Sequence, residues 1–142
     1  MKPKTLIILV VLLALFTVFL PTLQAQRQIL LYRVDVPFDF VAEGVHLPSG
    51  TYLVFRTAPQ IINMVSKDGR ASALVHIQHS DIAGGEGRNQ LVFNRYGDAK
   101  FLAQVRSEFN QQIQHCSMCP MELNLAAKYQ GPEVGTVLVA AK

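Results

Sequence analysis

The sequence predicts a mainly β domain: an antiparallel β-sandwich or small open barrel of about eight strands, with one late C-terminal helix. Three observations lead to this prediction. Apolar, β-branched and aromatic runs recur along the chain. Turn-forming Gly, Pro and Asp residues separate these runs. Several runs alternate apolar and polar residues, as in a strand with one buried face.

The start of the chain has the composition of a secretory signal peptide. Lys2 and Lys4 precede an almost wholly apolar run over residues 6–20, and the small residue Ala25 follows. The run is shorter than the roughly 20 residues with which a helix spans the apolar core of a bilayer. We therefore expect residues 1–25 to be a signal peptide that is removed during export. A retained membrane anchor is the alternative.

Residues 26–142 have the length of a single β-rich domain. Without the two leader lysines, the 13 Lys and Arg of the chain fall to 11, against 10 Asp and Glu. This balance gives no electrostatic basis for nucleic-acid binding. We expect a periplasmic, cell-surface or secreted protein, with no nucleic-acid partner and no stable membrane span after cleavage. A protein partner and a homo-oligomer both stay open.

The predicted strands end at turn-forming residues. They cover residues 29–36, 38–41, 51–57, 61–66, 71–78, 91–96, 100–105 and 134–140. Residues 52–55 are apolar on both faces, so their strand should be central. Asp68-Gly69 and Gly97-Asp98 each separate two predicted strands, and both pairs suit type I′ hairpin turns, which need positive φ at both central residues. The Gly-rich residues 80–89 should form a surface loop.

One segment has helical periodicity. Its apolar residues are Met118, Met121, Leu125 and Tyr129. Pro120 would lie in the first turn, where Pro is tolerated, and Gly131-Pro132 would end the helix. We expect a helix over about residues 118–130, with its two methionines packed in the core.

The densest group of reactive side chains precedes this helix. Cys116 and Cys119, the two cysteines of the chain, form a C-x-x-C pair beside His115 and two methionines. A disulfide is the first interpretation, because exported proteins meet an oxidising environment. Its short loop would contribute about 2 kcal/mol.

Two other interpretations of this group stay open. A C-x-x-C pair at a helix N-terminus favours a reactive thiolate, as in a thiol oxidoreductase, although thioredoxin-type motifs follow a strand of a βαβ unit. Alternatively, soft ligands from this group suit copper or zinc. They are His115, Cys116, Cys119 and Met121. Outside these alternatives we expect no cofactor, no catalytic residues and no enzymatic activity.

The other histidines carry weaker signals. His76 and His79 are three residues apart, which places them on opposite faces of a regular strand. His46 lies beside a turn near Glu43. We expect all three histidines at the surface. Nucleophile-elbow, metalloprotease, P-loop and dinucleotide-binding motifs are absent from the sequence.

Three stretches resemble the signatures of a group of small secreted β-rich proteins that is common in acidobacterial genomes. Residues 36–41 (VPFDFV) and 47–54 (LPSGTYLV) resemble its opening motif, and residues 91–105 (LVFNRYGDAKFLAQV) resemble its second motif. The resemblance implies a secreted β domain without an assigned role, and it supplies no catalytic residues. Cys116 and Cys119 depart from the group's pattern. The sequence thus favours a non-catalytic structural or binding module of the cell envelope or extracellular space, with a thiol-redox or soft-metal protein as the alternative.

The export prediction has a direct test. If residues 1–25 are a cleaved signal peptide, N-terminal sequencing of the exported protein will read Gln26 first. A start at Met1 in the membrane fraction would instead identify the segment as an anchor.

Overall fold

The computed structural model describes residue 3 and residues 27–84, 88–132 and 137–140. The predicted signal peptide, apart from Pro3, and its cleavage site at Ala25 lie outside the described residues. So do residues 133–136, where the last predicted strand was expected to begin.

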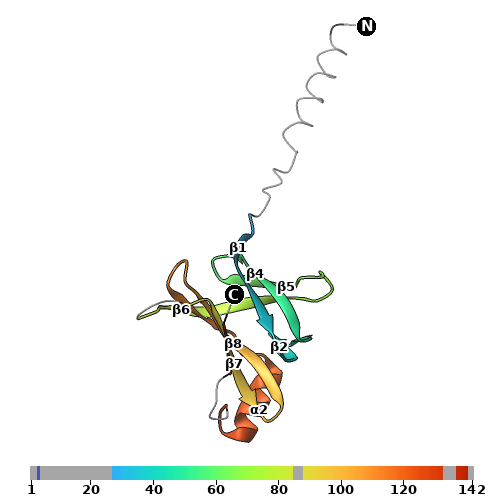
Figure 1. Cartoon of the computed structure of the whole chain (residues 1–142), viewed down its shortest axis with the longest axis vertical. Coiled ribbons are helices and arrows are strands. Elements are labelled where there is room, and N and C mark those ends of the chain that lie inside the picture. Colours follow the sequence, from blue (N-terminus) through green and yellow to red (C-terminus); the bar gives the residue numbers. More distant parts are fainter. Residues whose placement is uncertain (1–2, 4–26, 85–87, 133–136, 141–142) are drawn as a thin grey trace.

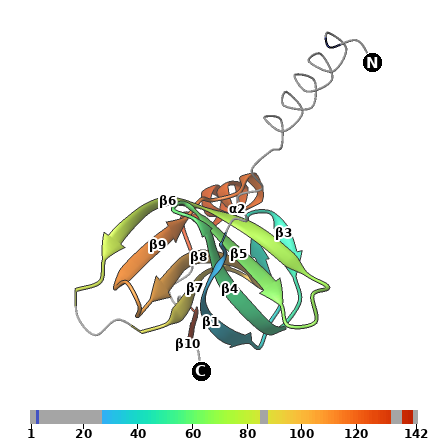
Figure 2. The same ribbon diagram turned by 90° about the horizontal axis from the view of Figure 1, so that it is seen from above.

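Within the described residues, ten strands form one open sheet and a single helix follows late in the chain (Figures 1 and 2). The strands are β1 (Ile29–Val36), β2 (Phe40–Ala42), β3 (Val45–Leu47), β4 (Gly50–Ala58), β5 (Ile61–Ser66), β6 (Ser72–Ile82), β7 (Gln90–Tyr96), β8 (Ala99–Ser107), β9 (Gln112–Cys116) and β10 (Val137–Ala140). The helix, α2, covers Pro120–Tyr129. The predicted mainly β fold with a late helix is confirmed. The strands β3 and β9 were not predicted, and β6 continues into the segment that was expected to be a loop.

Strand β6 joins the two parts of the sheet. Its first part pairs with β5, which continues to β4 and β1, and its second part pairs with β9, which continues to β8, β2 and β3. Strand β7 pairs with β8 and carries β10. These pairings are antiparallel except for β2 with β8, which meet in parallel at Val41 and Phe101. The sheet is therefore mixed, and Figure 2 shows it curving round a common interior.

The inner face of this curved sheet forms the main core. The side chains of Tyr52, Val54, Ile62, Val75 and Phe93 are almost completely buried there. Phe40 packs edge-on against both Tyr52 and Phe93, an arrangement that aromatic rings favour. Strand β4 lies between β1 and β5, so the prediction of a central strand is confirmed. Its second face is only half-buried.

A smaller apolar cluster lies on the other face of the sheet, beneath α2. Its buried residues are Val41, Tyr96, Phe101 and Cys119, and Leu125 and Ala126 of the helix pack against them. The helix begins at Pro120, and Met118 and Met121 are exposed. The prediction that these methionines pack in the core is therefore wrong. The helix turns the face that carries Leu125 and Ala126 toward the sheet, and its buried residue is Glu122.

Both predicted hairpins are present, but their turns differ from the prediction. Gly69 and Gly97 have positive φ, at 72° and 61°, whereas neither neighbouring aspartate does. Type I′ turns need two such residues, so that turn type is wrong at both places. The two-residue turn with positive φ throughout is Glu43-Gly44, where φ is 48° and 84° and β2 pairs directly with β3.

The turn at Gly69 allows a test in which backbone strain is the main variable. A Cβ atom added at Gly69 meets no atom within 4 Å, so Gly69→Val should lower the free energy of unfolding mainly by straining φ, by about 1–3 kcal/mol. Asn tolerates this region of φ, and Gly69→Asn is the control. Chemical denaturation measures both variants, and equal stabilities for Val and Asn would contradict the turn geometry.

Candidate metal-binding site

The candidate site depends on an irregularity where β6 pairs with β9. Ile77 lies opposite Cys116, whereas His79 lies opposite the next residue of β9, His115. Gln78 is therefore an extra residue without a partner, which is a β-bulge. Directly opposed residues project from the same face of a sheet. His79 and His115 thus project together from the face opposite to the core.

The bulge also overturns one sequence prediction. In a regular strand, His76 and His79 would lie on opposite faces. Because Gln78 is inserted between them, both project from the outer face of β6. The prediction of opposite faces is wrong, while the prediction that His46, His76 and His79 are exposed is confirmed.

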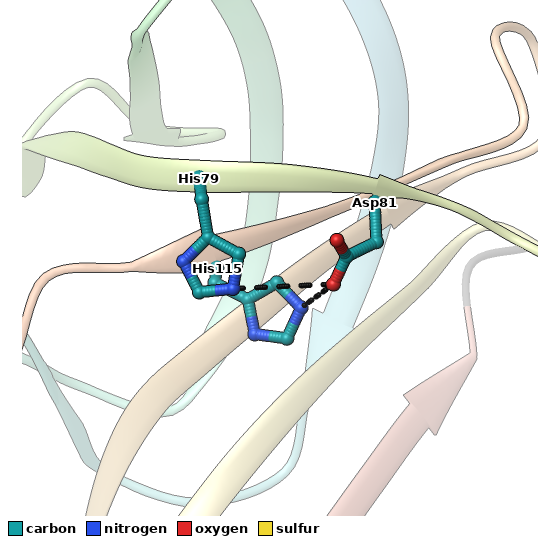
Figure 3. Close-up of side chains that lie close together, drawn as sticks. All are labelled: His79, Asp81 and His115. Atoms are coloured by element: carbon teal, nitrogen blue, oxygen red, sulfur yellow. Dashed lines mark hydrogen bonds and ion pairs between the residues drawn. The ribbon is translucent and has the colours of Figure 1, made fainter.

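Three potential metal ligands meet on this outer face: His79 and Asp81 from β6, and His115 from β9 (Figure 3). Asp81 Oδ2 lies 2.9 Å from His115 Nε2 and 3.9 Å from His79 Nε2. The two imidazole rings are stacked, with centroids 4.1 Å apart and 11° between their planes. One ligand atom from each residue falls within 4.8 Å of the other two. Imidazole and carboxylate ligands suit Zn²⁺ and related divalent transition metals.

The three side chains differ in their contact with solvent. The side chain of His115 is 26% exposed, whereas those of Asp81 and His79 are 60% and 57% exposed. His115 is therefore the most firmly packed of the three, and an ion bound here would have water on one side.

A hollow of about 230 Å³ adjoins these residues. It lies between β6, β7, β8, β9 and the start of α2, and His79 and His115 form part of its wall. Asn94, Met118 and Glu122 line it as well. The hollow thus combines imidazole, thioether, amide and carboxyl groups in one small space.

Glu122 is the buried acid of this hollow, with 3% of its surface exposed. Asn94 Nδ2 donates a hydrogen bond to Glu122 Oε1 at 3.0 Å, and the Tyr96 hydroxyl donates to the same oxygen at 3.5 Å. Burial raises the pKa of the Glu122 carboxyl, and the two hydrogen bonds offset only part of this rise. These bonds also tie α2 to β7.

Cys116 and Cys119 are buried free thiols in the structure. Cys116 belongs to the main core and Cys119 to the cluster beneath α2. Burial raises the pKa of the Cys116 thiol, and the carboxylates of Glu122 and Glu43 raise it further. A raised pKa opposes formation of the thiolate, so this environment disfavours a redox-active cysteine. The predicted disulfide stays a prediction.

The ligands named in the alternative metal interpretation of the sequence are spread over several places. His115 and Cys116 line the hollow, Cys119 is buried beneath α2, and Met121 is exposed on the helix. His79 and Asp81 join His115 instead. The sequence analysis missed His79 and Asp81, because it assigned His79 to the wrong face of the strand and Asp81 to a surface loop. The i, i+2 spacing of His79 and Asp81 was a signal for a shared strand face.

His76 and Glu43 form a second histidine–carboxylate pair, and no third potential ligand joins it among the described residues. Glu43, in the turn between β2 and β3, accepts hydrogen bonds from the backbone N–H of His76 and contacts its ring Nδ1. This pair fastens the β2–β3 hairpin to β6.

Comparison of the chain with protein-family models, with curated protein sequences and with solved structures finds no match. In the part of the chain that the structure describes, α2 is too short to cross a membrane, and no other helix is long and apolar enough to do so.

The buried carboxyl of Glu122 predicts a dependence of stability on pH. Because its pKa is raised on folding, the folded state keeps a proton that the unfolded chain has lost, and the free energy of unfolding falls as pH rises through this window. Glu122→Gln keeps the acceptor oxygen but has no proton to lose. We expect the Tm of the wild type, relative to the Tm of this variant, to fall as the pH rises above about 4.3, the ordinary pKa of a Glu carboxyl.

The exposed residue Glu108 provides a matched control. Glu108→Gln removes the same charge without changing a buried group, so its Tm difference from the wild type should change little over the same range. A Tm difference for Glu122→Gln that is constant with pH would contradict the assignment.

Proposed function

We propose that this chain is an exported, non-catalytic β domain that binds a divalent transition metal ion through His79, Asp81 and His115. One observation carries the proposal: three ligand atoms from two adjacent strands lie within 4.8 Å of one another. The leader sequence and the resemblance to secreted β-rich proteins support the location. The metal belongs to the class named in the alternative interpretation of the sequence, copper or zinc, but its ligands are different.

The geometry is close to that of an occupied site. Zinc ligands lie about 2.0–2.1 Å from the ion, which places the atoms of a tetrahedral site about 3.3 Å apart. The distance from Asp81 to His115 is 2.9 Å and that from Asp81 to His79 is 3.9 Å. Binding therefore requires one distance to lengthen and the other to shorten, each by about half an ångström. The stacked rings of His79 and His115 must also tilt, because the nitrogen lone pairs lie in the ring planes and these planes are nearly parallel. Asp81 and His79 are exposed, so their side chains can rotate to bind the ion.

We limit the proposal to binding because the sequence contains no nucleophile-elbow, metalloprotease or nucleotide-binding motif. Three protein ligands would leave one position of a tetrahedral ion open to solvent, as in catalytic zinc sites. The adjoining hollow is smaller than the roughly 300 Å³ at which ligand pockets usually begin. A water molecule or a small donor group fits this open position.

The test is a calorimetric titration of the exported protein, purified without chelator and then stripped of metal, with Zn²⁺. We expect one equivalent to bind. His115→Ala and Asp81→Asn should each weaken binding by at least about tenfold, since even the loss of a hydrogen-bond partner of a ligand costs that much. Acidification should also weaken binding, because a coordinating imidazole must be neutral.

His46→Ala is the matched control, because it removes an exposed imidazole that lies away from the three ligands. It should leave Zn²⁺ affinity unchanged. The proposal would be wrong if the wild type bound no Zn²⁺, or if His46→Ala weakened binding as much as His115→Ala.

A further inference from the structure

Met118 has no packing role that explains its position. It lies in the short connection between β9 and α2, outside both apolar clusters, and 39% of its surface is exposed. Yet it lines the hollow together with His79 and His115. The thioether sulfur of Met118 is therefore available to bind an ion.

We infer that this hollow binds Cu(I) through the imidazoles of His79 and His115 and the thioether of Met118. The inference rests on the proposed metal site and names a second ion for it. Thioether sulfur is a soft ligand that selects Cu(I), whereas a carboxylate suits harder divalent ions. The two ions would share the histidines and differ in the third ligand, which is Asp81 for a divalent metal and Met118 for Cu(I).

The surroundings of Met118 fit a monovalent cation. The residues that line the hollow include no Lys or Arg among those described, so no fixed positive charge on its wall opposes the ion. The amides of Gln78, Asn94 and Gln104 and the carboxyl of Glu122 supply polar oxygens around it. The sheet holds the histidines on paired strands, which places two of the three ligands before the ion arrives.

The two cysteines are the competing ligands for Cu(I), since thiolates also select this ion. Both are buried, and burial raises the pKa of the Cys116 thiol. Cys116 also lines the hollow and can compete there directly, whereas binding to Cys119 would require the helix to move. The experiment must therefore distinguish Cu(I) binding at Met118 from Cu(I) binding at the cysteines. Methionine variants that keep both thiols make this distinction.

The test measures Cu(I) affinity of the exported protein by competition with the chromogenic chelator bicinchoninate under anaerobic, reducing conditions. Met118→Leu keeps the side-chain volume and removes the sulfur. It should weaken Cu(I) binding by at least about tenfold, while its Zn²⁺ affinity stays that of the wild type. Met121→Leu is the matched control, because Met121 is exposed on α2 and does not line the hollow. It should bind both ions as the wild type does.

X-ray absorption of the Cu(I) complex gives a second readout. We expect nitrogen and sulfur scattering in the wild type and in Met121→Leu, and loss of the sulfur contribution in Met118→Leu. Equal Cu(I) affinities in all three proteins, or sulfur scattering that persists in Met118→Leu, would place Cu(I) on the cysteines and overturn the inference. In that case, Zn²⁺ binding by the wild type would still support the divalent site. If the wild type also bound no Zn²⁺, the proposed function would be wrong as well.

Discussion

Strand β6 is the element on which the rest of the structure depends. It pairs with β5 as far as His76 and with β9 from Ile77 onward, and the bulge at Gln78 lies just beyond this change of partner. The bulge leaves Ile77 opposite Cys116 in the core and turns His79 outward, opposite His115. One inserted residue therefore keeps the interior apolar and gathers potential metal ligands on the outer face.

The helix α2 and the connection before it form one wall of the hollow beside His79 and His115. The helix packs on the outer face of β7 and β8 through Leu125 and Ala126, and the buried carboxyl of Glu122 accepts hydrogen bonds from two residues of β7. The connection that leads into the helix brings Met118 to the hollow. In the proposed site, Asp81 would supply a hard third ligand and Met118 a soft one beside the same two histidines.

Local signals in the sequence predicted the fold class, the hairpins at Gly69 and Gly97, the central strand and the late helix. They failed where the outcome depends on tertiary contacts. Strand β9 is rich in Gln and His and lacks the apolar pattern of a strand. Helical spacing placed Met118 and Met121 in the core, but the helix buries Glu122 instead, whose hydrogen bonds to β7 compensate for its polarity. The candidate metal site was missed because Asp81 and His115 are 34 residues apart and meet only through the bulged pairing of β6 with β9.

A crystal structure of the protein soaked with Zn²⁺, with anomalous scattering recorded at the zinc edge, tests the central claim most directly. The account predicts one strong anomalous peak about 2.0–2.1 Å from Nε2 of His79, Nε2 of His115 and a carboxylate oxygen of Asp81. A strong peak on the cysteines instead, or none between β6 and β9, would contradict it.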